Sequence, residues 1–308
     1  MLLLTLITRK DTMIQYPAVN DLYSLSEHLG KAIWLNNWRQ GFMAAFTAYF
    51  DASGHQEDPQ MPLVSVAGFI APPDVWNDFE VKWKDRLAKD GLTVFHMSEC
   101  ANCEYDFQQW RAREPDRQRL LRDLLEIIKP LSRKFGCTVP LKTYRERLDL
   151  ELVEQFKFKA YVLAGRACAA KVRQWCERDG APPLSRIQFF FERGDNWQPE
   201  LRERLMDDGF GEPIFKPKRD LYRNGTLVEH GLIPFQAADV LAYITFLAQK
   251  FLIQGRDDWG DKESIRWVLE ELEEHSVPGS LNNFTPQNLD GINSLMRVCS
   301  IDLLGWNG

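Results

Sequence analysis

The sequence predicts an α/β fold. Short apolar runs rich in aromatic and β-branched residues, at 46–51, 63–71, 135–139 and 187–192, have the length and composition of strands. Other segments repeat apolar residues at helical spacing, most clearly at 234–252. Strands that alternate with helices along one chain are typical of a sheet covered by helices.

Size and composition narrow the class of protein. The chain has 308 residues, of which 44% are hydrophobic, and can bury a full core. Its formal net charge of -6 excludes a surface that is basic throughout, although a local basic groove for nucleic acid remains open. No apolar run is long enough to span a membrane, so we expect no membrane association.

The cysteines and the first residues indicate the compartment. Six cysteines are scattered along a long chain, which is typical of reduced thiols in a cytoplasmic protein: Cys100, Cys103, Cys137, Cys168, Cys176 and Cys299. The apolar start at 1–7 is followed, not preceded, by its positive charges, so we interpret it as neither a secretory signal nor an anchor. Protein partners cannot be inferred from these features.

We divide the chain into three parts. Residues 1–42 lack clear alternation and have only a weak helical stretch near 22–38, so we interpret them as an N-terminal extension that is poorly ordered or lies upstream of the true start. Met43 directly precedes the first strand and is the alternative start. Residues 43–255 are expected to form the main domain, and 256–308 a helical C-terminal extension that packs on it.

The first strand carries an acid at its end. In 46–51, side chains alternate between faces, so Thr47, Tyr49 and Asp51 share one face. Ser53 and Gly54 then turn the chain, since glycine tolerates the backbone angles of a tight turn. A short polar loop at 55–62 leads to the second strand, and the pair is expected to form an antiparallel hairpin.

The remaining elements follow in chain order. Proline and aspartate at 72–74 begin a helix whose buried stripe is Trp76, Phe79, Trp83 and Leu87. The same criteria then predict a third strand at 92–96, a helix at 116–129, a strand near 135–139, a long helix at about 148–178, a strand at 187–192, a helix at 199–207, an extended basic stretch at 213–219, an apolar helix at 234–252, and a helical tail from 262.

Three acids lie in apolar settings. Asp51 and Glu192 end strands, and Asp239 lies one turn inside an apolar helix. Each alone has a plain structural explanation, as a turn cap or as a solvent-facing helix residue. Together, carboxylates that converge at strand ends can hold one or two hard divalent cations such as Mg²⁺ or Mn²⁺. Two such ions can clamp the attacking and leaving oxygens of a phosphodiester.

Several short motifs occur in the same order as in a known bacterial family. They are Tyr49-Phe50-Asp51-Ala52-Ser53-Gly54, the strand with Ala67-Gly68, Phe95-His96-Met97, Phe191-Glu192-Arg193-Gly194-Asp195 and Pro234-Phe235-Gln236-Ala237-Ala238-Asp239. On these motifs the chain resembles the family catalogued as domain of unknown function 3800. The first and last motifs are the most specific. Many family members have Glu where this chain has Ala52, which removes one candidate acid.

This resemblance implies a ribonuclease H-like mixed sheet flanked by helices. In such a fold a central strand supplies the first acid, another strand the second, and a late helix the third. The matching residues here are Asp51, Glu192 and Asp239, with Asp195 as a further metal ligand. The implied chemistry is metal-assisted attack of water on a phosphodiester. The family has no firmly established substrate, so fold and metal chemistry are implied more strongly than function.

Three further residues are candidates for the same site. His96 ends the predicted third strand and could carry a proton near neutral pH, or be a satisfied buried histidine. Gln236 lies three residues before Asp239 on one helix face, where it could orient a ligand or bond the helix start. Ser53 is expected to contact substrate. It is not expected to act as a nucleophile, since it lies too close in sequence to Asp51 and His55 for a nucleophilic relay.

A basic stretch precedes the Asp239 helix. Lys216, Lys218 and Arg219, with Tyr222 and Arg223 close behind, suit a phosphate backbone and a nucleic-acid partner. The alternative is an ordinary solvated face. A single Cys-x-x-Cys at 100–103 has no second pair, so we do not expect a structural zinc site.

Three functions remain in competition. The first is a metal-dependent nuclease or related phosphoryl-transfer hydrolase. The second is a non-catalytic binding or regulatory protein of the same fold, for example in a phage-defence or mobile-element module, in which the acids are structural. The third is a metal-dependent hydrolase of a small phosphorylated molecule.

Overall fold

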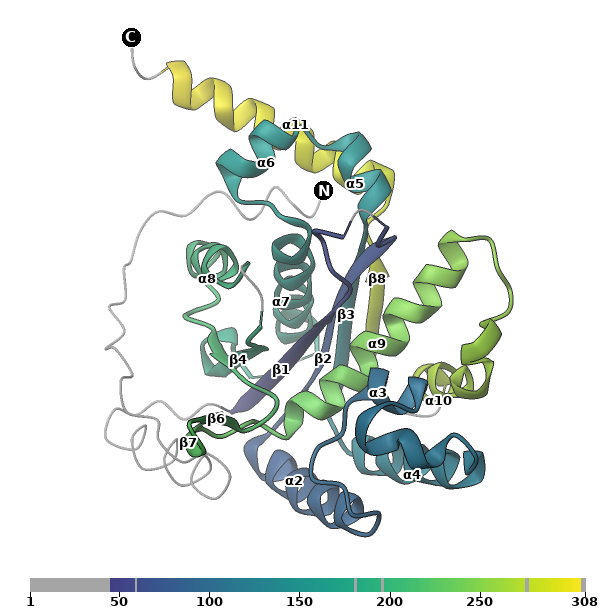
Figure 1. Ribbon diagram of the computed structural model, residues 1–308. Helices are drawn as coiled ribbons and strands as arrows, with labels where there is room; N and C mark the ends of the chain where they lie inside the picture. Colours follow the sequence, from purple (N-terminus) through teal and green to yellow (C-terminus); the bar gives the residue numbers. More distant parts are fainter. Residues whose placement is uncertain (1–44, 59, 180–181, 195–196, 275–276, 306–308) are drawn as a thin grey trace, which may run out of the picture.

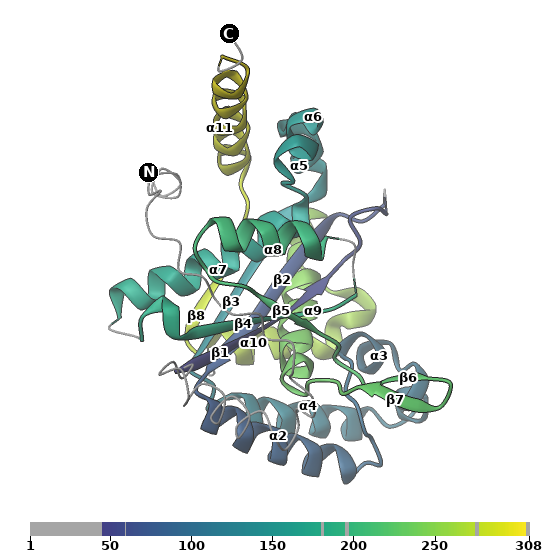
Figure 2. The same ribbon diagram turned by 90° about the vertical axis from the view of Figure 1, so that its left-hand side faces the viewer.

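A computed structural model describes residues 45–58, 60–179, 182–194, 197–274 and 277–305 (Figure 1). The predictions for 1–42 and for Asp195 lie outside the described residues. Within them, the chain forms an α/β fold with a mixed sheet between two layers of helices (Figures 1 and 2). None of the described helices is long and apolar enough to cross a membrane.

The main sheet has six strands in the order β5-β4-β1-β2-β3-β8. The neighbours β1–β2 and β2–β3 are antiparallel, whereas β1–β4, β4–β5 and β3–β8 are parallel. The predicted hairpin of the first two strands is therefore confirmed. The strands are β1 (Phe46–Ser53), β2 (Leu63–Ala71), β3 (Arg133–Pro140), β4 (Ile187–Glu192), β5 (Ile214–Lys216) and β8 (Gly279–Asn283).

Each face of the sheet packs against its own hydrophobic cluster. Tyr49 on β1 lies in the cluster that includes α9 (Pro234–Ile253), whereas Ala48 and Phe50 lie in the cluster that includes α7 (Ala160–Arg178). The alternation predicted for the first strand is confirmed. Figure 1 shows α7 and α8 (Gln198–Asp207) on one side of the sheet and α9 on the other. Asp51 has the same alternation as Tyr49 and therefore faces α9.

The other helices extend these two layers. The side of α9 also carries α2, α3, α4 and α10, and the side of α7 carries α5, α6, α8 and α11. Their bounds are α2 (Pro73–Ala88), α3 (Met97–Asn102), η2 (Tyr105–Trp110), α4 (Glu114–Ile128), α5 (Leu141–Arg147), α6 (Leu150–Phe156), η3 (Leu184–Arg186), α8 (Gln198–Asp207), η4 (Gly260–Ile265), α10 (Trp267–Glu274) and α11 (Pro286–Gly305).

The long helix predicted at 148–178 is two helices, so this prediction was wrong. Helix α6 ends at Phe156, and Lys157 takes a left-handed conformation with φ 52°. The chain then extends before α7 begins at Ala160, whose backbone N–H donates to the Gln56 side chain. Apolar spacing continues across the break, which is why periodicity alone did not reveal it.

The strand predicted at 92–96 does not form either. This segment has no strand partner and leads directly into α3. Its end is held by side chains of α9: the N–H of Phe95 donates to Gln236, and that of Met97 donates to Asp239. A backbone whose N–H groups are satisfied by side chains does not need a place in the sheet.

Three short strands were missing from the sequence prediction. Strand β8 lies in the C-terminal region that was expected to be helical, and it pairs with β3 at the sheet edge. Strands β6 (Leu221–Arg223) and β7 (Thr226–Glu229) form a separate two-stranded sheet. Each has only three to five residues, too few for a periodic signal.

We predict that Gly68→Ala destabilises the fold strongly. An added Cβ at Gly68 would lie 1.8 Å from the Tyr49 carbonyl oxygen and 2.8 Å from Phe50 Cα, inside a fully packed sheet. We expect the free energy of unfolding to fall by about 3 kcal/mol or more, measured by urea denaturation. Gly291→Ala is the control, because its Cβ meets no atom within 4 Å. Equal effects of the two substitutions would contradict this close packing.

Candidate acidic site

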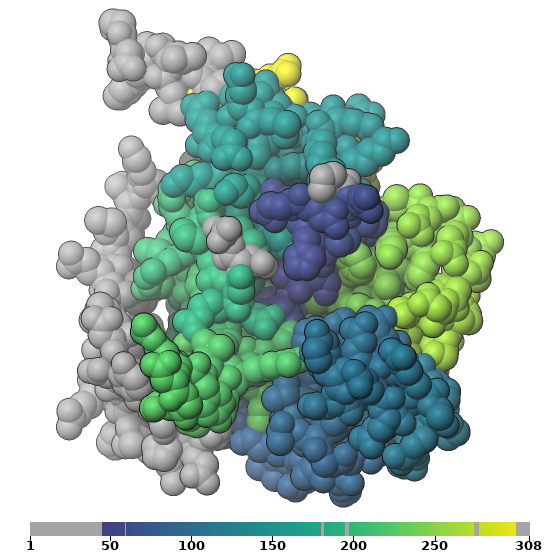
Figure 3. All heavy atoms as spheres, in the orientation of Figure 1, coloured from purple at the N-terminus to yellow at the C-terminus, as the bar shows by residue number. Residues whose placement is uncertain are grey.

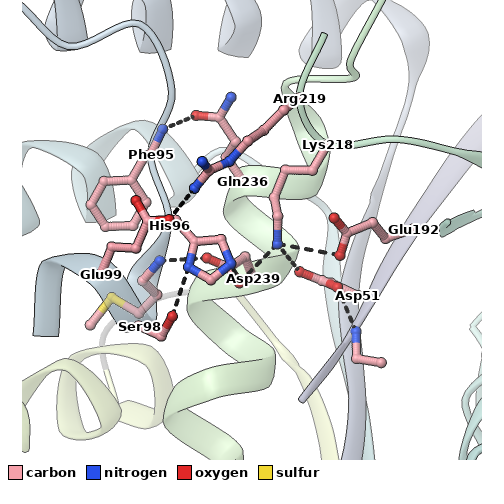
Figure 4. Close-up of polar contacts among 12 residues, drawn as sticks. Asp51, Phe95, His96, Ser98, Glu99, Glu192, Lys218, Arg219, Gln236 and Asp239 are labelled. Atoms are coloured by element: carbon pink, nitrogen blue, oxygen red, sulfur yellow. Dashed lines mark hydrogen bonds and ion pairs between the residues drawn. The ribbon is translucent and has the colours of Figure 1, made fainter. Parts of the chain in front are cut away.

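The structure brings three predicted acids together around one lysine (Figure 4). The Lys218 Nζ lies 2.7 Å from Asp51 Oδ2, 3.0 Å from Asp239 Oδ1 and 3.3 Å from Glu192 Oε2. Since all three oxygens contact one nitrogen atom, the three carboxylates converge. The lysine at their centre was not expected from the sequence.

The three acids come from three elements that the sheet and its covering helix hold in register. Asp51 lies in β1, two residues before the strand ends, and Glu192 is the last residue of β4. These strands are parallel neighbours in which Phe50 pairs with Phe191, so the two acids follow paired residues. Asp239 faces them from α9, which packs across β1 and β2. The site therefore depends on tertiary packing more than on any one loop.

The cluster is deeply buried and holds three carboxyl groups for one ammonium. Only 2% of Asp51, 4% of Asp239 and 6% of Lys218 is exposed. Burial raises the pKa of Asp51 well above its usual value; the Lys218 ammonium opposes this effect, and the charge of Glu192 adds to it. Three carboxylates thus share one ammonium in surroundings where an unbalanced charge is costly.

Asp239 and Lys218 favour their charged forms despite burial. Burial alone would raise the pKa of Asp239, but Lys218, His96 and the backbone N–H of Met97 together lower it. Burial alone would lower the pKa of Lys218, but Asp239, Asp51 and Glu192 outweigh it and raise that pKa. An ion pair of Lys218 with Asp239 therefore anchors the cluster.

The open side of the cluster is formed by Glu192 and His96. Their side chains are 25% and 28% exposed, whereas those of Asp51 and Asp239 are almost fully covered. His96 Nε2 lies 3.8 Å from Asp239 Oδ1, and Nδ1 lies 2.8 Å from Ser98 Oγ. A reactant would approach from this side and meet Glu192 and His96 first.

Gln236 holds the segment that carries His96. Its carboxamide oxygen accepts hydrogen bonds from Trp83 Nε1 and from the N–H of Phe95, each at 2.8 Å. It therefore positions the backbone next to His96 and does not bond the start of its own helix through this oxygen. The contribution of Trp83 to this arrangement was not foreseen, because its place in the helical stripe indicated only core packing.

The predicted basic stretch is paired with carboxylates. Lys216 Nζ lies 2.9 Å from Glu229 Oε1, and Arg219 bonds Glu99 on α3. Lys218 was expected on a substrate-binding surface, but it lies inside the acidic cluster. The reason is that buried carboxylates are costly without a positively charged partner, which Lys218 provides. Ser53 is the last residue of β1, two residues beyond Asp51.

The donor set fits Mg²⁺ or Mn²⁺, but the central position is taken by Lys218. In the described ranges, no group of three or more histidine, cysteine, aspartate or glutamate side chains is arranged as a ready metal site. Three converging carboxylates are nevertheless the hard oxygen ligands that these ions prefer. Binding of an ion would require the Lys218 ammonium to leave the position between them.

Comparison with known proteins gives no match: no family model, curated protein or solved structure corresponds to this chain. Its function therefore has to be inferred from its residues and their geometry.

We predict that Lys218→Met destabilises the protein by about 3–5 kcal/mol at neutral pH, because it leaves three carboxylates without their cation. Without the ammonium, the folded-state pKa of Asp51 rises further above its unfolded value, and burial raises that of Asp239 above its own. The folded variant then binds protons more strongly than the unfolded chain and loses stability as pH rises above the ordinary carboxyl range.

Urea denaturation of wild type and variant at acidic and neutral pH tests this. The stability gap should be small at acidic pH and large at neutral pH. Lys82→Met is the matched control, since Lys82 is 55% exposed and pairs with Asp78 on the surface of α2. A gap that does not change with pH would contradict an electrostatic role for Lys218.

Proposed function

We propose that this chain is a divalent-metal-dependent nuclease or related phosphoryl-transfer hydrolase whose centre is Asp51, Glu192 and Asp239. One observation carries the proposal: three carboxylates from two strands and a helix converge on a single cation. Two of them are buried, an arrangement that is costly unless a positive charge is present. Asp195, three residues after Glu192 in the sequence, remains part of the proposal as a further ligand.

The order of the elements supports a ribonuclease H-like fold as part of this proposal. Asp51 lies on β1, which has neighbours on both sides in the sheet, and Glu192 lies on the adjacent β4. Asp239 lies on α9, after the last strand on that side of the sheet. A central strand, a second strand and a late helix are the sources that the resemblance implies.

Charge balance favours exchange of the ammonium for a divalent ion. The ammonium neutralises one of three carboxylates, whereas Mg²⁺ or Mn²⁺ would neutralise two from the same position. A buried site in which one ammonium faces three carboxyl groups therefore gains from the exchange, because a divalent ion favours the ionised form of more of them. Asp51, Glu192 and Asp239 would hold the ion.

The residues around the cluster suit hydrolysis of a phosphodiester. Bound there, the ion would activate a water molecule and stabilise the charge that develops on the phosphoryl group. On the open side, His96 can accept or release a proton, and its Nδ1 is held next to Ser98 Oγ. Glu192, the most exposed acid of the three, is placed to orient the incoming group.

We predict that Asp51→Asn abolishes metal-dependent cleavage while the protein stays folded. The amide keeps the shape of the side chain but removes one negatively charged ligand. Cleavage of labelled DNA and RNA is measured with Mg²⁺, with Mn²⁺ and with a chelator, and circular dichroism monitors the fold. Asp78→Asn, at an exposed position on α2, is the control and should cleave like wild type. Cleavage by Asp51→Asn at the wild-type rate would contradict the proposal.

We predict that Lys218→Ala binds Mn²⁺ more tightly than wild type does. The ion and the ammonium compete for one position, so removing the ammonium removes the competitor. Isothermal titration calorimetry measures the affinity, and Mn²⁺ should also restore part of the thermal stability that the variant loses. Lys82→Ala should bind Mn²⁺ like wild type. Unchanged affinity in Lys218→Ala would show that the ion does not take this position.

A non-catalytic protein of the same fold is the second candidate, and the Lys218 contacts favour it. The lysine contacts all three acids, as it would in a purely structural cluster. Absence of Mg²⁺ and Mn²⁺ binding in both wild type and Asp239→Asn would support this candidate. A substrate panel of DNA, RNA and small phosphoesters separates a nuclease from a hydrolase of small molecules.

A further inference from the structure

A β-hairpin projects from the rim of the acidic site. Strands β6 and β7 pair only with each other and are joined by a tight turn at Asn224 and Gly225, which have φ values of 52° and 76°. Figure 2 shows the hairpin extending away from the main sheet with its turn at the free end. The hairpin begins three residues after Lys218, the lysine at the centre of the acidic cluster.

The base of the hairpin is firmly attached. Glu229 at the end of β7 pairs with Lys216 at the end of β5 and with Arg193 just after β4. Asp220 accepts a hydrogen bond from the N–H of Gly231 at 2.8 Å, which closes the neck. These contacts join the hairpin to β4, which is the neighbour of β1, and to β5, which is the next strand outward, so its position relative to the acidic cluster is defined.

The hairpin exposes large apolar side chains, and this exposure does not contribute to its stability. Leu221, Tyr222 and Val228 are 38%, 64% and 51% exposed, and they are three of ten large hydrophobic side chains exposed in the described part of the chain. A lone two-stranded hairpin is marginally stable in water, and large apolar groups left exposed on it indicate a binding surface. Figure 3 shows the hairpin, in bright green, standing out at the surface.

One cation on the hairpin that is unpaired among the described residues favours an anionic partner. Arg223 is exposed and forms no ion pair with any described residue. By contrast, Lys216, Lys218 and Arg219 are each paired with carboxylates. In a chain of net charge -6, Arg223 is thus the cation of this segment that is available to an external ligand.

We propose that the β6–β7 hairpin binds a single strand of nucleic acid and leads it to the acidic cluster. Tyr222 stacks on an unpaired base, and Arg223 contacts the phosphate backbone. A base in a duplex already stacks on its neighbours, so an exposed ring favours single strands. The proposal rests on the proposed function, because it assigns the substrate class of the same site.

The test measures binding without cleavage. Full-length protein is titrated, in the presence of a chelator, into fluorescein-labelled single-stranded DNA and RNA of about 20 nucleotides and into the matching duplexes, with anisotropy as the readout. The variants are Tyr222→Ala, Arg223→Ala and the double substitution. The control is Lys142→Ala with Leu150→Ala, one exposed cation and one exposed apolar residue on α5 and α6, far from the hairpin in Figure 1.

Wild type should bind the single strand more tightly than the duplex. The double substitution should weaken binding about tenfold or more, and Arg223→Ala should reduce the salt slope by about one. The control should bind like wild type. No binding by wild type, a preference for duplex, or unchanged affinity in the double substitution would overturn the proposal. A wild-type dimer that Tyr222→Ala converts to monomer would also overturn it, since the hairpin would then bind a second copy.

The outcome is distinguishable from that of the proposed function. Loss of single-strand binding in the hairpin variants, with no metal-dependent cleavage by wild type, would support strand binding by the hairpin and reject nuclease activity. Cleavage that depends on Asp51, with hairpin variants that bind like wild type, would support the nuclease and reject the hairpin.

Discussion

Two buried carboxylates that require a positive partner determine the structure around the site. Asp51 and Asp239 have almost no contact with solvent, and leaving either charge unpaired would cost several kcal/mol. Lys218 supplies the positive charge, which requires the segment after β5 to reach back over β4 to β1. Asp239 also accepts a hydrogen bond from the N–H of Met97, so the same acid holds the start of α3.

The core beside the cluster keeps the two strand acids in register. Tyr49 stacks on Phe190 with ring centroids 4.9 Å apart, and on the other face Phe50 stacks on Phe191 at 5.3 Å. These pairs tie β1 to β4 on both faces just before Asp51, so the position of the acid follows from aromatic packing. Substitutions of these aromatic residues are therefore expected to alter the geometry of the site, although they replace none of its acids.

Much of this arrangement was predictable from the residues, and the failures have physical reasons. Alternation in 46–51 and the apolar run 187–192 locate the central strands, because a strand buried on both faces has a strong compositional signal. Asp51, Glu192 and Asp239 were predictable as unusual acids in apolar settings. Their partner Lys218 was not, because a lysine in a basic stretch has no local feature that distinguishes burial from exposure. The strand predicted at 92–96 was wrong for a similar reason, since the hydrogen bonds of this segment go to α9, about 140 residues later.

The short segment from Lys216 to Glu229 links the two proposals. It places Lys218 among the acids and, within three residues, begins the exposed hairpin. Entry of a metal ion requires Lys218 to leave, yet the pairs of Glu229 with Lys216 and Arg193 hold both ends of this segment. The lysine side chain can therefore withdraw while the hairpin keeps its place. In the two proposals, ion exchange at the centre and strand binding at the rim would then be separate events on one segment. A substitution in the hairpin should therefore alter substrate affinity without changing the affinity for the ion.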